Sequence, residues 1–164
     1  MKLRAFILLT PLVFLVHDAE EVATVARWTR EHGDVIPALA RGLLPIDTRQ
    51  FAAAVALLFV ILSVVSFLAA RKPEGIAIRV WLVLLAALTA NGITHPAQAL
   101  VVGGYVPGVV TAVLVVIPLG VLAWRRALID GVTSRRAILP LFLAGLAIQL
   151  PIVVLALLFG RGAG

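Results

Sequence analysis

The side chains best able to do chemistry lie in "HDAEE", a polar stretch inside an otherwise aliphatic run. At about 100° per residue, His17, Glu20 and Glu21 share one face of a helix, whereas Asp18 lies nearer its edge. Ionised groups are costly at membrane depth, so they pair, bind an ion or face water. We therefore expect this face to be one wall of a site.

Two later motifs carry further polar groups. In "NGITH", Asn91 and His95 are four residues apart and share a helix face. In "YVPGVVT", Tyr105 and Thr111 bring hydroxyls to the start of another helix, for which Pro107 suits the first turn. Each motif alone is weak, so their meaning depends on whether the helices bring them together.

The donor atoms in these motifs suit a metal. Two imidazoles with two carboxylates form a nitrogen and oxygen ligand set that favours Zn, Fe or Mn. The chain contains no cysteine, which excludes thiolate ligands and disulfides. We expect a divalent metal bound by His17, Glu20, Glu21 and His95.

The same residues predict catalytic roles. Glu20 or Glu21 beside a metal-activated water would act as general base in a hydrolase, and iron in the same ligands would suit an oxidoreductase. Asn91 or Tyr105 would orient a ligand, polarise a carbonyl or pass a proton. Thr111 joins this catalytic set through its hydroxyl.

Composition indicates an integral membrane protein. Hydrophobic residues make up 62% of the 164 and charged residues 13%, against about half and a quarter in soluble domains. The net charge of +6 does not indicate a nucleic-acid partner, because the basic residues flank apolar runs. The expected partner is the lipid bilayer.

The fold class predicted is all-α: a polytopic transmembrane bundle of about five helices in a single domain, 1–164. No segment alternates with the period of two that a barrel strand needs. Pro140 and Pro151 are expected to kink the last helix. Each apolar run is near the roughly 20 residues that span a bilayer; the runs are 5–27, 50–70, 78–101, 106–124 and 137–159.

The basic residues predict an orientation with the N-terminus inside and the C-terminus outside. The segments that would then be cytoplasmic hold more of the 14 basic residues than the outer segments do. The inner set is Lys2, Arg4, Arg71, Lys72, Arg79, Arg125, Arg126, Arg135 and Arg136. The outer segment 28–49 is expected to be a connector rather than a lid, and within it "VIPALARGLL" is compatible with a short amphipathic or re-entrant piece on the membrane surface.

Depth places the three motifs together. At about 1.5 Å per residue, His17, Glu21, Asn91, His95 and Thr111 all fall in the outer half of the bilayer. We expect a polar pocket between the first, third and fourth helices that opens outward.

Two alternatives remain for the first segment. Residues 1–26 could be a cleaved signal peptide, with a small-residue site before Arg27. The carboxylates could also lie at the wet end of a membrane helix and pair with Arg27 and Arg30. Neither alternative explains two histidines on two different helices well.

The three motifs, in this order and spacing, resemble the HXXEE family of small bacterial and archaeal multi-span membrane proteins, for which no function is established. The resemblance runs through most of the chain up to residue 111. Gly92 departs from the family's Asn-Ala-x-x-His pattern, and a smaller residue there should admit closer helix packing. The resemblance implies that the functional set is His17, Glu20, Glu21, Asn91, His95, Tyr105, Pro107, Gly108 and Thr111.

The function expected from these residues is a metal-dependent membrane enzyme acting on a lipid or other apolar substrate. The alternatives are a proton-coupled carrier of small molecules or a non-catalytic membrane binding protein. A carrier would normally have its site near the midplane between repeats, and no convincing internal repeat is present. We expect a multi-pass protein of a prokaryotic plasma membrane, and a homo-oligomer is compatible with the sequence.

Overall fold

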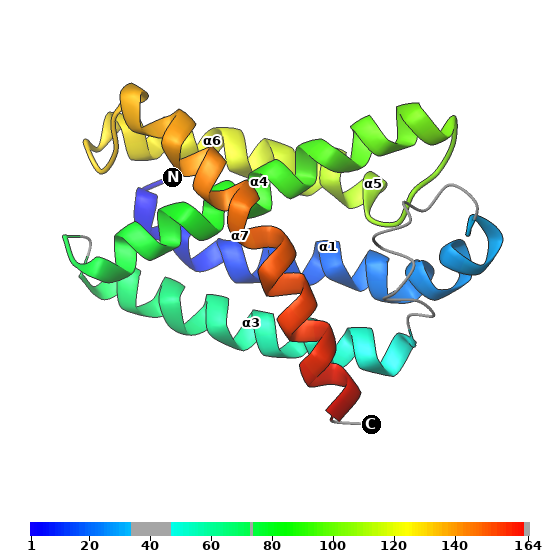
Figure 1. Cartoon of the computed structure of the whole chain (residues 1–164). Coiled ribbons are helices and arrows are strands. Elements are labelled where there is room, and N and C mark those ends of the chain that lie inside the picture. Colours follow the sequence, from blue (N-terminus) through cyan, green and yellow to red (C-terminus); the bar gives the residue numbers. More distant parts are fainter. Residues whose placement is uncertain (34–46, 73, 163–164) are drawn as a thin grey trace.

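The computed structural model describes residues 1–33, 47–72 and 74–162, and the chain is helical with no strand in these ranges. Five helical segments run back and forth (Figure 1). They are α1 (Leu3–Glu31), α3 (Thr48–Arg71), α4 (Ile76–Val102), the continuous series α5 (Val109–Thr111), η1 (Ala112–Val116) and α6 (Ile117–Ile129), and α7 (Arg135–Gly162). The predicted all-helical bundle of five helices is confirmed.

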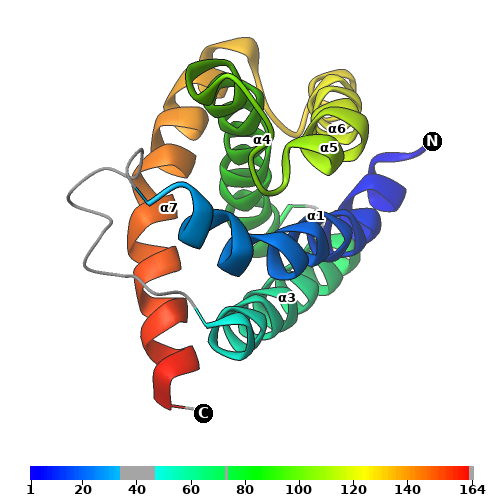
Figure 2. The same ribbon diagram turned by 90° about the vertical axis from the view of Figure 1, so that its right-hand side faces the viewer.

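The helices form a bundle in which α1 lies between α3 and the α5–α6 series. Figure 2 shows α1 beside α3 on one side and beside α5 and α6 on the other. The last helix, α7, crosses the others obliquely and packs on α4 and α3 (Figure 1). The chain begins at one end of the bundle, and α1, α4 and the α5–α6 series reach the other end, where the polar motifs lie.

Among the residues that the structure describes, three segments are long and apolar enough to cross a membrane: Thr48–Arg71, Ile76–Val102 and Val109–Ile129. The apolar run of α1 is interrupted by the carboxylates of "HDAEE". That α1 and α7 also cross the membrane, and that the N-terminus lies inside, stay predictions.

Most predicted bounds agree with the helices to within a few residues. Residues 28–31, expected in a loop, continue α1, and the surface piece expected in that loop falls within residues 34–46, outside the described residues. The fourth helix begins at Val109 rather than 106, because Gly108 has a left-handed φ of 82° that precedes the helix. Pro107 therefore lies in the turn and not in the first helical turn.

Close contacts at two glycines bring the helices together. A Cβ at Gly92 would lie 2.7 Å from Val116 Cγ1, so this glycine lets α4 approach η1, as its departure from the family motif led us to expect. A Cβ at Gly145 would lie 2.6 Å from the backbone nitrogen of Ala87, so α7 packs directly on the α4 backbone. α7 remains helical through both of its internal prolines.

The π-helical turn η1 was not predicted. The Ile117 N–H bonds to the Ala112 carbonyl five residues back. Pro118 follows immediately and has no N–H to donate to Leu114, which favours a wider turn at this point. This turn lies directly after Thr111, so it helps to set where α5 sits beside α1.

The interior has an apolar half and a polar half. At the end where the chain begins, Ile7, Leu85 and Trp81 are fully buried in a core formed by α1, α3, α4 and α6. The Trp81 indole N–H donates to Thr10 Oγ1 at 3.2 Å and the Trp124 indole N–H donates to Thr89 Oγ1 at 3.4 Å, so both tryptophans of this core have a hydrogen-bond partner. The site residues fill the other half.

Candidate metal centre

Three elements bring the predicted residues to one place. α1 contributes His17, Glu20 and Glu21, and α4 contributes Asn91 and His95. The turn after α4, which also holds Pro107, and the short α5 contribute Tyr105, Gly108 and Thr111. Each of these side chains, and the Gly108 backbone, contacts at least one other member of the set.

Three donor atoms form a group of the size that one ion needs. Glu21 Oε1 lies 2.9 Å from His95 Nε2 and 3.5 Å from His17 Nε2. The donor atoms of the three residues all lie within 4.8 Å of one another, and the two imidazole rings meet edge to face. With bonds near 2.0–2.1 Å, tetrahedral zinc holds its donors about 3.3 Å apart. The trio of His17, Glu21 and His95 therefore fits a metal ion with small adjustments.

The proton on the His17 ring is fixed by hydrogen bonds. Thr111 Oγ1 lies 2.6 Å from Glu20 Oε2, and a carboxylate can only accept, so the hydroxyl donates its hydrogen to Glu20. At 3.0 Å from His17 Nδ1, the same oxygen then accepts the Nδ1 hydrogen. The neutral His17 ring consequently keeps its lone pair on Nε2, the atom that faces Glu21. This is how ligand histidines are oriented in metalloproteins.

Glu20 has a different position from Glu21. Its carboxylate accepts hydrogen bonds from the Tyr105 hydroxyl at 2.9 Å, the Thr111 N–H at 2.8 Å and the Val110 N–H at 3.3 Å, besides the Thr111 hydroxyl. Glu20 was expected among the metal ligands and as a possible base. The structure instead directs its oxygens to α5 and the preceding turn, outside the donor trio.

Asn91 bridges the two histidines. Its Nδ2 lies 3.2 Å from Nε2 of His17 and 3.2 Å from Nε2 of His95. The other ring nitrogen of His95, Nδ1, is buried and has no hydrogen-bond partner among the described residues. By the same reasoning, Glu21 Oε1 lies 2.9 Å from His95 Nε2 and can only accept, so the hydrogen of the neutral His95 ring lies on Nε2, and a metal bound there would displace it.

Gly108 closes the site from the side of the α4–α5 turn. A Cβ at this position would lie 2.9 Å from Glu21 Oε1, 2.9 Å from His17 Cε1 and 3.0 Å from His95 Cε1. Its φ of 82° is also in the left-handed region that favours glycine. Both the conformation and the space require glycine here, so a main-chain segment directly covers the trio.

The turn that carries Gly108 is fastened to α1. The Tyr105 hydroxyl donates to Glu20, and burial raises the pKa of Tyr105, with Glu20 acting in the same direction. The Trp28 indole N–H donates to the Tyr105 carbonyl at 2.8 Å. Trp28 was not predicted as part of the site, although it follows Glu20 and Thr24 at steps of four along the same helix face.

The arginines near the end of α1 do not neutralise the motif carboxylates. Arg27 Nε pairs with Glu31 Oε1 at 2.8 Å, and the interactions of Glu20 and Glu21 in the described residues are those with the site. This arrangement does not match the alternative in which Glu20 and Glu21 pair with Arg27 and Arg30.

Comparison with known proteins supports the family and supplies no activity. A family model described as "Protein of unknown function with HXXEE motif" matches residues 8–123, which covers the three motifs and most of the chain. No curated protein and no solved structure matches it. The geometry gives the motif a physical meaning, since its histidine and second glutamate face His95 while its first glutamate bonds to Thr111. This chain belongs to the HXXEE family.

Proposed function

We propose that the chain is a metal-dependent membrane enzyme whose ion is bound by His17 Nε2, Glu21 Oε1 and His95 Nε2. The observation that carries the proposal is the mutual approach of these three donor atoms, from two helices, within 4.8 Å. Three protein ligands leave a coordination position open, as in catalytic rather than structural sites. Two histidines and one carboxylate suit Zn, Fe or Mn.

A bound ion would supply Lewis acidity and water activation, or oxygen chemistry in the case of iron. The surrounding residues would orient the metal ligands and the substrate. The Thr111 hydroxyl keeps the proton of His17 on Nδ1, and Glu20 positions that hydroxyl by accepting its hydrogen bond. Asn91 places an amide group between the two imidazoles, where it could orient a substrate oxygen.

Glu21 is the better candidate for proton transfer. The Glu20 carboxylate already accepts four hydrogen bonds, which stabilise its ionised form and make it a poor base. Glu21 Oε2 accepts no hydrogen bond from the residues that the structure describes. We therefore assign Glu21 both ligand binding through one oxygen and proton transfer through the other.

The surroundings favour a substrate that comes from the membrane. Ile93, Val110 and Val113 lie on helical turns next to the site and are about half exposed. A polar centre among apolar surfaces of membrane-crossing helices suits a lipid or another apolar molecule with one reactive polar group. The reaction on such a molecule would be hydrolysis or oxidation.

The decisive measurement is the metal content of the purified protein, prepared without chelators. We expect close to one Zn, Fe or Mn per chain, lost in both His17→Ala and His95→Ala. His32→Ala is the matched control, because His32 stacks on Trp28 outside the trio and should not change the metal content. Wild-type protein that holds no metal and takes up none on titration with each ion would refute the proposal.

An activity measurement then addresses the enzyme itself. Metal-loaded wild-type protein and Glu21→Gln are incubated with a bacterial lipid extract, and the products are identified by mass spectrometry. We expect a lipid product with the wild type that is absent with Glu21→Gln. Metal binding without product, together with flux in sealed vesicles, would instead favour a carrier.

A further inference from the structure

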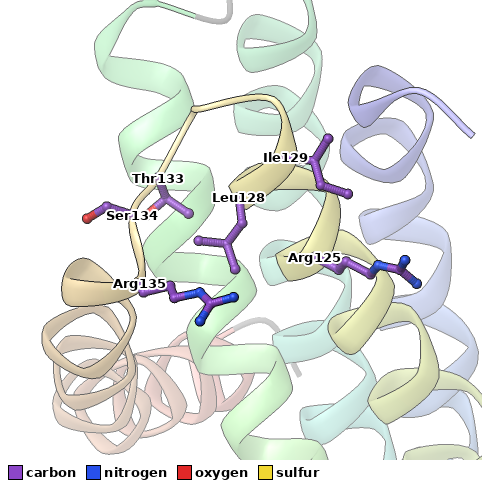
Figure 3. Close-up of a pocket in the computed structure, with 6 residues that line it drawn as sticks. All are labelled: Arg125, Leu128, Ile129, Thr133, Ser134 and Arg135. Carbon is purple, nitrogen blue, oxygen red and sulfur yellow. The ribbon is translucent and has the colours of Figure 1, made fainter.

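A cavity with two arginines lies at the end of the bundle away from the metal centre. It is about 560 Å³ and sits where α6 ends and α7 begins. Figure 3 shows Arg125 on α6 and Arg135 at the start of α7, with Leu128 between them. The lining is Arg125, Leu128, Ile129, Thr133, Ser134 and Arg135. It therefore combines cations with an apolar wall.

The two arginines are not neutralised within the described part of the chain. The neighbouring Arg126 is neutralised by Asp130, because its Nη2 and Nε donate to the two carboxylate oxygens at 2.8 Å and 3.0 Å. Neither Arg125 nor Arg135 forms an ion pair with a described residue. Two guanidinium groups thus remain available for an anion, and arginine binds phosphate oxygens in a bidentate manner.

Each arginine stands at the end of an exposed apolar stripe. Leu122 precedes Arg125 by one helical turn and is 50% exposed. Leu139 and Leu143 follow Arg135 at steps of four residues and are 67% and 57% exposed. A positive charge that ends an apolar helix face matches a phospholipid, in which an anionic phosphate joins two acyl chains.

We propose that this cavity binds an anionic glycerophospholipid, with its phosphodiester held by the lining arginines Arg125 and Arg135 and its acyl chains along the apolar faces of α6 and α7. Leu128 and Ile129 in the cavity wall favour a lipid over free phosphate, because a hydrated inorganic ion gains nothing from apolar contact. The proposal is independent of the metal centre, which lies at the other end of the bundle.

The test measures lipid binding to the purified full chain by native mass spectrometry. Phosphatidylglycerol and phosphatidylcholine with the same acyl chains are compared for the wild type and for Arg125→Gln/Arg135→Gln. At about 1 kcal/mol for each basic residue at an anionic surface, the double variant should bind phosphatidylglycerol about thirty-fold more weakly. The matched control, Arg30→Gln/Arg49→Gln, removes the same charge from exposed residues at the opposite end and should leave this binding unchanged.

Three results would overturn the proposal: an equal loss in the control variant, equal binding of both lipids by the wild type, or displacement of the lipid by millimolar inorganic phosphate. The last result would identify free phosphate as the ligand. Arg125→Lys/Arg135→Lys keeps both charges and covers the case in which the glutamine variant fails to fold. It should retain the preference for phosphatidylglycerol, and a folded lysine variant without that preference would contradict the proposal.

Discussion

Replacing Thr111 by valine removes one hydroxyl and leaves a side chain of nearly the same shape. That hydroxyl accepts the Nδ1 hydrogen of His17 and donates to Glu20. His17 is fully buried, so its Nδ1–H would lose its partner where water does not replace it, at a cost of about 1–3 kcal/mol of folding stability. The proton could then move to Nε2 and block the metal-binding lone pair. Loss of such an orienting partner weakens metal binding by about 10–100-fold, or about 1.4–2.7 kcal/mol.

The assay is a competitive titration of the purified protein with a zinc indicator of known affinity, accompanied by thermal unfolding. Thr111→Ser keeps the hydroxyl and should bind metal nearly as the wild type does. Thr24→Val is the matched control, because its hydroxyl donates to the Glu20 main-chain carbonyl and accepts no hydrogen from a ring nitrogen. Unchanged metal affinity in Thr111→Val, or equal weakening in the serine variant, would show that the hydroxyl does not set the His17 tautomer.

Three further outcomes follow from the same contacts. Gly108→Ala should abolish metal binding, because its Cβ would lie 2.9 Å from Glu21 Oε1. Gly131 has a similar φ of 69° but open space around it, so Gly131→Ala is the control and should bind metal normally. Equal metal titrations of the two variants would refute this prediction. Glu21→Gln should lose the metal, whereas Glu20→Gln should only weaken metal binding. Equal metal contents in the two variants would contradict the assignment of Glu21, and not Glu20, as the ligand. Tyr105 is the single tyrosine, so the absorbance of the protein at alkaline pH reports the ionisation of this side chain. The midpoint of that titration should lie above about 10, and Glu20→Gln should lower it. The neutral Tyr105 hydroxyl stabilises the folded state below about pH 10, and this stabilisation is lost as the pH rises through the folded pKa.

The residues of the centre could be found in the sequence because their chemistry conflicts with their surroundings. A histidine and carboxylates in an aliphatic helix, and a second histidine on another helix, have few explanations other than a shared site. Helical spacing then placed His17 with Glu21, and Asn91 with His95, on common faces. The family resemblance added Gly108 through its motif, without a reason for glycine at that position.

The amino-acid sequence by itself determined the class of the fold, because five long apolar runs can satisfy their backbone groups in a membrane only as helices. It also predicted that the polar residues of the different helices lie at similar levels along the bundle, since rise per residue is fixed in a helix. It could not separate Glu20 from Glu21, because both lie on the face that includes His17. Only the tertiary structure decided that Glu21 meets His95 while Glu20 bonds to Thr111. The reason is that α5 and its turn approach α1 through glycine and a π-helical turn, a contact between distant segments that no local spacing encodes.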